Sequence, residues 1–187
     1  DDARQAGVAG WSQADVVALL KSGRNAHATV SGPMATVVAG STQHLADDDL
    51  QAIATFLRAL PARRTQPPPH EAAAAAQRAL GAKRYAQHCA NCHGEQGEGS
   101  PNVAPALRGN RAVVMDPPTN VIRVVLGGGY GPATAANPRP HGMPPFAIAL
   151  SNEDVAAVVT HIRSAWGHDA SAVDTVAVDR QRGGTGR

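Results

Sequence analysis

Apolar residues in the first third of the chain recur at the spacing of an α-helix. One helix is expected over residues 12–22, with a start signal at Ser12 and a stop signal at Gly23. Its apolar stripe consists of Val16, Leu19 and Leu20. A second helix is expected to be capped by Asp47 and ended by Pro61. Its apolar positions are Leu50, Ile53, Leu57 and Leu60. The residues between these two helices are expected to form a loop.

The rest of the chain shows the same helical period. An Ala-rich helix is expected from about residue 71 to 88, and another one after Asp116 that ends at Gly127. The last helix opens on a capping box of Ser151 and Asp154. Its apolar face consists of Val155, Val158, Val159, Ile162 and Trp166. No segment alternates apolar and polar residues as a strand would, so the fold class is predicted to be all-α.

The order of these elements repeats within the chain. A helix, a glycine stop, a proline-bearing loop with one methionine and an acidic-capped helix occur first with Met34 and again with Met143. We therefore expect residues 1–60 to be the rear part of a domain whose front part is absent. The expected organisation continues with a Pro-rich linker at 61–71, a complete domain at 72–168 and a polar tail at 169–187, with its final RQRGGTGR disordered.

Composition excludes several function classes. The 187 residues correspond to one or two domains, and no apolar run has the length of a membrane span. The net charge of +2 is spread along the chain and only 3% of residues are aromatic, so no nucleic-acid partner is expected. The absence of a start Met and of a leader suggests a mature or cut segment. Large apolar residues are scarce, which predicts that a cofactor completes the core.

The sequence CANCHG at 89–94 carries the strongest chemical signal. Cys89 and Cys92 lie three residues apart, where both can form thioethers to the vinyl groups of one haem, and His93 follows as a proximal iron ligand. A zinc knuckle would need more ligands at metal spacing, and a thioredoxin-like pair would need a βαβ context. Neither context is present, so the motif predicts one covalently bound haem c.

The sixth iron ligand must come from another segment. The candidates are Met115, Met143, His141 and His161. Met143 is preferred because Pro144 and Pro145 stiffen its loop, while His141 remains the main competitor. Met115 is expected to be a packing residue and His161 to face solvent. A His/Met pair raises the reduction potential and leaves no open iron position, which suits electron transfer. The alternative is a haem enzyme or ligand sensor whose distal position is open or displaceable.

The spacing Gly81, Tyr85, Cys89, Cys92 and His93 resembles the first helix of class I c-type cytochromes. This resemblance implies a cytochrome c fold in which the last helix crosses closely over the glycine. The expected crossing partners are Ile162 and Trp166. It also implies that the Pro105 carbonyl accepts the outer N–H of His93 and that Leu107 packs on the haem. Arg108 and Arg111 are interpreted as solvated surface, with contact to a haem propionate as the alternative.

Residues 77–168 further resemble the last domain of the three-haem cytochrome subunits of bacterial membrane-bound alcohol, gluconate, sorbitol and aldehyde dehydrogenases. The matching stretches are PALRGN, PTNVIRVVLGGG, HGMPPF and LSNEDVAAVVTHIRSAWG. Residues 11–60 resemble the rear of the middle domain, which here lacks its CxxCH.

This resemblance implies a periplasmic electron-transfer subunit that is not itself an enzyme. Its partner would be a quinoprotein, flavoprotein or molybdoprotein dehydrogenase, with quinone at the membrane or another carrier as acceptor, and membrane association would come through the complex. Met34 would bind a haem only in a complete parent protein. An alternative role for residues 1–60 is a docking surface for the dehydrogenase.

Overall fold

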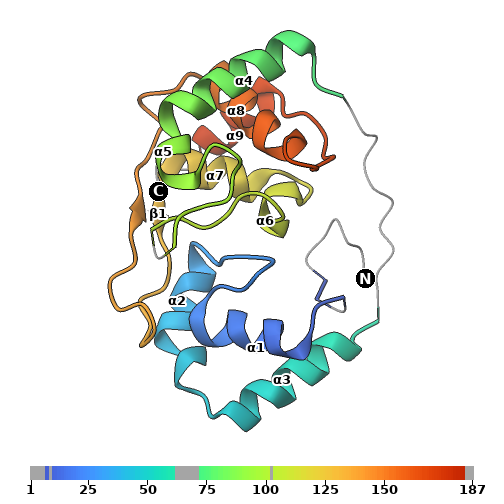
Figure 1. Cartoon of the computed structure of the whole chain (residues 1–187), viewed down its shortest axis with the longest axis vertical. Helices are drawn as coiled ribbons and strands as arrows, with labels where there is room; N and C mark the ends of the chain where they lie inside the picture. Colours follow the sequence, from blue (N-terminus) through green and yellow to red (C-terminus); the bar gives the residue numbers. More distant parts are fainter. Residues whose placement is uncertain (1–6, 9, 62–71, 102, 184–187) are drawn as a thin grey trace. The chain divides into compact units, whose positions relative to one another are not determined.

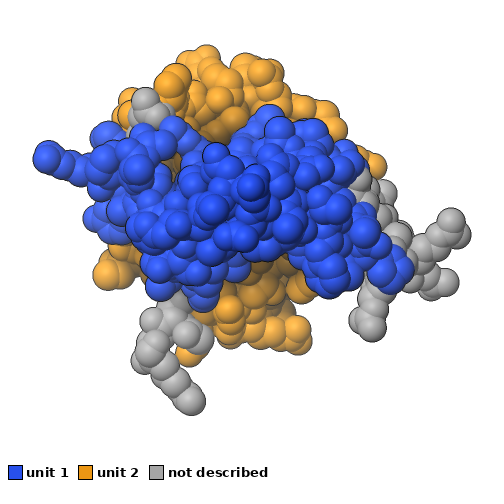
Figure 2. Space-filling view, turned by 90° about the horizontal axis from the view of Figure 1, so that it is seen from below, with its two compact units in different colours: residues 1–66, 130–141 blue, residues 67–129, 142–187 orange. Residues whose placement is uncertain are grey.

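The computed structural model describes residues 7–8, 10–61, 72–101 and 103–183. It divides into two compact units (Figures 1 and 2). Unit 1 comprises residues 1–66 and 130–141, and unit 2 comprises residues 67–129 and 142–187. The expected linker at 61–71 lies, apart from Pro61, outside the described residues. Among those that are described, no helix is long and apolar enough to cross a membrane.

Unit 1 contains three α-helices in its described part. They are α1 (Gln13–Ser22), α2 (Pro33–Gly40) and α3 (Asp47–Ala59), with a 3-10 turn η1 (Thr42–His44) before α3. The Ser12 hydroxyl accepts from the Asp15 N–H, and α1 ends at the left-handed Gly23, which confirms the first expected helix.

Two expectations for unit 1 are wrong. Helix α2 occupies the segment expected to be a loop, because Pro33 begins a helix well and mostly apolar residues follow it. The cap of α3 is Ala46 and not Asp47, whose carboxylate lies instead in the first turn.

The core of unit 1 is small. Leu50 and Ala54 of α3 are fully buried, as is Val38 of α2, and Val16 of α1 is almost so. Trp11 stacks on His27 with 5.2 Å between the ring centroids. A second apolar set stays exposed, with Met34 at 46% and Phe56 at 66% of their surface accessible.

Unit 2 contains six α-helices within the described ranges. They are α4 (Ala75–His88), α5 (Ala90–His93), α6 (Arg111–Val114), α7 (Thr119–Gly127), α8 (Asn152–Ser164) and α9 (Thr175–Arg182). The capping box of Ser151 and Asp154 begins α8 as expected. Helices α4 and α8 pack side by side (Figure 1). Val155, Val159 and Leu126 are fully buried in the core that α7 and α8 share. The fold is all-α, as predicted.

The last helix is shorter than expected. It ends at Ser164, and Trp166 has a φ of 55°, outside the helical region. The residues of α8 beneath Gly81 are Ala157 and His161, so the expected crossing partners Ile162 and Trp166 are wrong. Ile162 points into the core instead, because it lies on the buried face of α8. Trp166 packs its ring against Tyr85.

The segment expected to be a polar tail contains an ordered helix, α9. Asp174 caps it by accepting from the Ala177 N–H at 2.6 Å, and Val178 is fully buried against the core of unit 2. Arg182 donates from Nη2 to the Leu150 carbonyl at 2.9 Å. The tail folds because two apolar residues, Val173 and Val178, pack against the core formed with α7 and α8. The local sequence does not predict this long-range contact. The first three residues of RQRGGTGR therefore lie in a helix, and 184–187 lie outside the described residues.

The structure contains a two-stranded ribbon that the sequence did not predict. Strand β1 (Gly129–Tyr130) pairs with β2 (Gly142–Met143), and each is too short to show an alternating pattern. Residues 130–141, from the last residue of β1 to the residue before β2, were expected to belong to the domain 72–168 but pack within unit 1. This placement follows from tertiary contacts that involve Gln43 and Pro132.

Candidate haem centre

The CxxCH segment lies at a break between two helices. Cys89 ends α4 with φ −120° and ψ −40°, and α5 continues from Ala90 to His93. The backbone N–H of His93 donates to the Cys89 carbonyl at 2.9 Å, which keeps the segment in one helical turn. Both cysteines are free, Cys89 half-buried and Cys92 exposed. Burial, with a smaller contribution from Cys92, raises the pKa of the Cys89 thiol to about 11.

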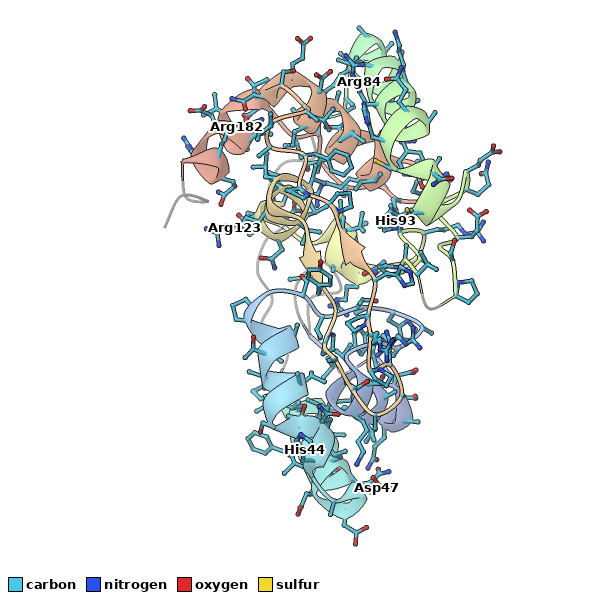
Figure 3. All side chains as sticks on the ribbon, turned by 90° about the vertical axis from the view of Figure 1, so that its left-hand side faces the viewer. His44, Asp47, Arg84, His93, Arg123 and Arg182 are labelled. Carbon is cyan, nitrogen blue, oxygen red and sulfur yellow. The ribbon has the colours of Figure 1, made fainter. Side chains whose placement is uncertain are left out.

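His93, labelled in Figure 3, is buried, with 8% of its surface exposed. Its Nδ1 lies 2.9 Å from the carbonyl oxygen of Pro105. A carbonyl oxygen only accepts, so Nδ1 carries the proton and Nε2 keeps its lone pair in the neutral ring. Burial lowers the pKa of His93 and outweighs the opposing effect of the Pro105 bond. The imidazole is thus held neutral and in the tautomer that binds a metal through Nε2.

The loop after His93 is tied back to the motif by hydrogen bonds. The Tyr85 hydroxyl donates to the Gly94 carbonyl at 2.6 Å, and burial is the main cause that raises the pKa of that phenol. The Ser100 hydroxyl donates to the Cys92 carbonyl at 3.0 Å. Gly97 is left-handed, and a Cβ there would lie 2.5 Å from the Trp166 ring, so only glycine fits this close approach. The segment after Pro105 is tied to the same loop, because the Leu107 N–H donates to the Gly97 carbonyl at 2.8 Å.

Several apolar side chains of unit 2 are partly exposed although they pack on its core. They include Cys89, Leu107, Val121, Met143 and Phe146. Two thiols, a neutral imidazole with a free Nε2 and apolar side chains are the groups that a covalently attached haem requires. The residues present therefore fit haem c. No group of three or more His, Cys, Asp or Glu in the described part of the chain could hold a metal ion by itself.

Met143 is half-buried and is held from both sides. A Cβ at Gly128 would lie 2.3 Å from the Met143 carbonyl oxygen, so the chain passes directly over that glycine. Three residues later the backbone is anchored again, because the Phe146 N–H donates to the Val125 carbonyl at 3.1 Å. The expected stiffening by Pro144 and Pro145 is thus supplemented by backbone contacts to the end of α7.

The competing ligand candidates have other surroundings. His141 is exposed and belongs to unit 1. Met115 is half-buried and its carbonyl accepts from the Arg163 guanidinium at 2.7 Å. His161 was expected to face solvent, which is wrong. Its ring is half-buried against Tyr85 and Trp166, with centroid distances of 5.4 and 5.6 Å, and burial lowers its pKa.

Two more arginines and one methionine were singled out from the sequence. Arg108 is exposed and Arg111 is half-buried. Met34 is nearly half exposed on α2 of unit 1.

Sequence reasoning missed two polar residues that hold this region together. Arg163 is fully buried, and His168 accepts from the Gly109 N–H at 3.0 Å through Nε2. Its Nδ1 lies 2.7 Å from the Ile162 carbonyl. For Arg163, the only signal in the sequence was a charged residue on an otherwise apolar helix face.

Comparison with known proteins identifies the domain. The cytochrome c family profile matches residues 78–166. Cytochrome c-552 of Thermus thermophilus is 38% identical over 96 residues, which are 50% of this chain and 72% of that protein. The chain belongs to the cytochrome c family. Haem c, bound through the CxxCH motif of Cys89 to His93, is therefore its cofactor, and the cytochrome c fold predicted from the sequence is confirmed.

Longer relatives align with both units. The cytochrome c subunit of alcohol dehydrogenase (quinone) from Gluconobacter oxydans is 40% identical over 172 residues, which cover 88% of this cytochrome chain and 36% of that protein. The cytochrome c subunit of gluconate 2-dehydrogenase from Pantoea cypripedii is 35% identical over 178 residues, with 90% and 40% covered. The chain thus spans well under half the length of these relatives, and the resemblance to dehydrogenase cytochrome subunits is confirmed.

Proposed function

We propose that this chain is an electron-transfer module with one haem c, which Cys89 and Cys92 would hold covalently and to whose iron His93 and Met143 would be the ligands. The observation that carries the proposal is the contact between His93 and Pro105, which presents the imidazole as a neutral Nε2 donor before any iron is bound. When bound, the haem supplies a one-electron ferric/ferrous couple.

The residues of the chain adapt that couple to electron transfer. Burial of His93 and its fixed tautomer limit rearrangement when the charge on the iron changes. Met143, anchored between Gly128 and Phe146, offers a thioether that would close the sixth position against substrate. Leu107, partly buried on the core of unit 2, would supply an apolar contact to the haem.

The partner and acceptor are proposed from the relatives. Their names describe cytochrome subunits of alcohol, gluconate and fructose dehydrogenases. We propose that a dehydrogenase subunit, whether a quinoprotein, flavoprotein or molybdoprotein, oxidises the substrate and passes electrons to this cytochrome. Quinone, or another carrier, then receives them, in the periplasm and with membrane association through the complex.

We propose further that residues 1–60 are the rear part of a second cytochrome c domain, with Met34 as a ligand in a complete parent protein. Internal similarity supports this assignment. Leu50 and Ala54 of α3 are fully buried, as are Val155 and Val159 at the same spacing in α8. Phe56 of α3, at the position that His161 occupies in α8, is 66% exposed, whereas His161 contacts α4 beneath Gly81.

The haem proposal is tested on protein produced in a host that attaches haem c. We expect mass spectrometry to find one porphyrin on the peptide that contains Cys89 and Cys92. We expect the ferric protein to be low-spin by electron paramagnetic resonance and the ferrous protein to bind carbon monoxide slowly. Met143→Ala should make the iron high-spin and carbon monoxide binding rapid, whereas the matched control Met115→Ala should leave both unchanged. A high-spin wild-type protein that binds carbon monoxide at once would instead indicate a ligand sensor or a haem enzyme.

A further inference from the structure

We propose that His168 is a positioning residue for the haem centre, because it fastens the segment that presents the Pro105 carbonyl to His93. The proposal rests on the proposed ligation of the haem iron by His93. Every contact that carries it lies within unit 2. His93 donates from Nδ1 to the Pro105 carbonyl at 2.9 Å, and a bond of this kind raises the basicity of the ligating Nε2. A residue that holds Pro105 in place therefore acts on the iron and not only on stability.

His168 joins the end of α8 to an exposed turn at Gly109. The Gly109 N–H donates to Nε2 of His168 at 3.0 Å, and Nδ1 of His168 donates to the Ile162 carbonyl at 2.7 Å. An accepting Nε2 carries no proton, so one neutral ring makes both bonds. The backbone of His168 is anchored as well, because its N–H donates to the Ala165 carbonyl at 2.9 Å. The imidazole thus links the turn to a helix that is packed in the core.

Asn110 connects this link to Pro105. Asn110 is buried, with 8% of its surface exposed, and its Nδ2 donates to the Ala106 carbonyl at 3.0 Å. Its backbone N–H donates to the Leu107 carbonyl at 3.1 Å. Gly109 therefore belongs to a hydrogen-bonded turn that includes Ala106, the residue after Pro105. A displacement of the turn at Gly109 moves Ala106 and the adjoining Pro105 carbonyl with it.

The near end of the same segment is held by the loop that follows the CxxCH motif. A Cβ at Gly99 would lie 2.7 Å from the carbonyl carbon of Pro105, so the two stretches of backbone are in direct contact. The Leu107 N–H donates into this loop at 2.8 Å. The far end, at Gly109, is exposed. His168 attaches that far end, which reduces the conformational freedom of the whole segment.

The test compares His168→Leu with His168→Gln in the complete, haem-loaded chain. Glutamine offers one donor and one acceptor, as the neutral ring does, whereas leucine offers neither. In the ferrous low-spin protein, which is diamagnetic, NMR follows the exchange of the His93 Nδ1 proton with solvent. Loss of the two His168 bonds in His168→Leu should raise the population of the opened segment, and hence this exchange rate, about tenfold. His168→Gln should exchange at close to the wild-type rate.

The midpoint potential is a second readout, which a loss of stability alone does not move. When Pro105 is displaced, its bond to His93 weakens and Nε2 becomes less basic, which disfavours ferric iron. In His168→Leu the ratio of ferrous to ferric protein at the wild-type midpoint potential should rise about threefold, which is about 30 mV for one electron. His168→Ala removes the same bonds without adding bulk and should give the same two changes.

Val178→Ala is the control for a general loss of stability, because Val178 is fully buried in the core of unit 2. It should change neither the exchange rate nor the potential. If His168→Leu and His168→Ala keep the wild-type values, or if Val178→Ala changes them equally, the inference is wrong. It is also wrong if His168→Gln behaves like His168→Leu, because the two hydrogen bonds are then not responsible. Failure of the haem proposal would look different, since the wild-type protein itself would then carry no porphyrin or contain high-spin iron.

Discussion

The missing side chain of Gly81 and the carbonyl oxygen of Ala157 define how closely α4 approaches α8. A Cβ at Gly81 would lie 2.1 Å from that oxygen and 2.8 Å from the Cβ of His161. The nearest atom belongs to the backbone, so a larger residue cannot be accommodated by a change of rotamer. Since α4 leads directly into Cys89, this crossing also sets where the haem motif lies against the core of unit 2.

Gly81→Ala should therefore destabilise the protein, although alanine is the better helix former. We expect a loss of about 2 kcal/mol or more in the free energy of unfolding, measured by urea denaturation followed by circular dichroism. Gly127→Ala is the matched control, because Gly127 also lies in a helix and nothing stands within 4 Å of its Cβ position. Equal stability of the two variants would contradict the close crossing.

Substitution of the buried Arg163 should lower the free energy of unfolding far more than substitution of an exposed arginine. Its guanidinium donates to the Val113 and Met115 carbonyls at 2.9 and 2.7 Å and to Asp116 Oδ1 at 2.6 Å. Burial lowers its pKa, and the nearby Asp116 carboxylate opposes this effect. Arg163→Leu leaves these acceptors without a donor and should cost about 3–5 kcal/mol.

A control for this arginine is Arg123→Leu, which removes one exposed bond to Gln181. It should cost less than about 1 kcal/mol in the same urea titration. A small loss for Arg163→Leu would show that its network adds little to stability.

The carboxylate of Asp154 should make the free energy of unfolding decrease as the pH is lowered. Burial raises its pKa, but the bonds from Arg84 and Ser151 outweigh burial, so the pKa of Asp154 lies below its ordinary value. A carboxylate with a lowered folded-state pKa stabilises the fold above its unfolded pKa of about 4, and this stabilisation is lost as the pH falls through the folded value. Asp154→Asn should therefore reduce how steeply the urea unfolding midpoint falls with pH below about pH 5.

Glu153→Gln serves as the control for Asp154, because it removes a neighbouring, exposed carboxylate from the same helical turn. In Glu153→Gln the urea midpoint should fall with pH as steeply as in the wild type. If the midpoints of the wild type and Asp154→Asn fall equally steeply, Asp154 does not have this role.

Helix α9 should contribute to the stability of unit 2. Val178 is fully buried whereas Val176, two residues earlier, is 54% exposed. Val178→Ala should cost about 1–3 kcal/mol, and Val176→Ala should cost less than about 0.5 kcal/mol. Thermal unfolding followed by circular dichroism distinguishes the two variants. If both have the wild-type midpoint, α9 does not stabilise the core.

The local sequence was sufficient for the elements that are governed by short-range chemistry. The Ser12 and Ser151 starts, the Gly23 stop and the helical stripes on α3 and α8 need only neighbours three or four residues away. The haem motif was recognisable for the same reason, since its chemistry requires two thiols and an imidazole at fixed spacing. The cap of α3 was misplaced by one residue because Asp47 is as favourable in a first turn as at the cap.

Other features depended on partners far away in the sequence. Helix α9 forms around Val178 only because α7 and α8 offer an apolar surface, and His161 is covered only because Tyr85 and Trp166 meet there. No local pattern encodes such contacts.

By itself, the sequence determined the all-α class, the CxxCH motif that indicates haem c, and the positions of the main helices, because periodicity and ligand spacing are local properties. Only the tertiary structure decided that His93 faces Pro105, that Gly81 lies on Ala157, and that Gln43 docks a loop about ninety residues away. Such pairings arise when the whole chain buries its apolar surface and satisfies its polar groups together, so no single segment contains them.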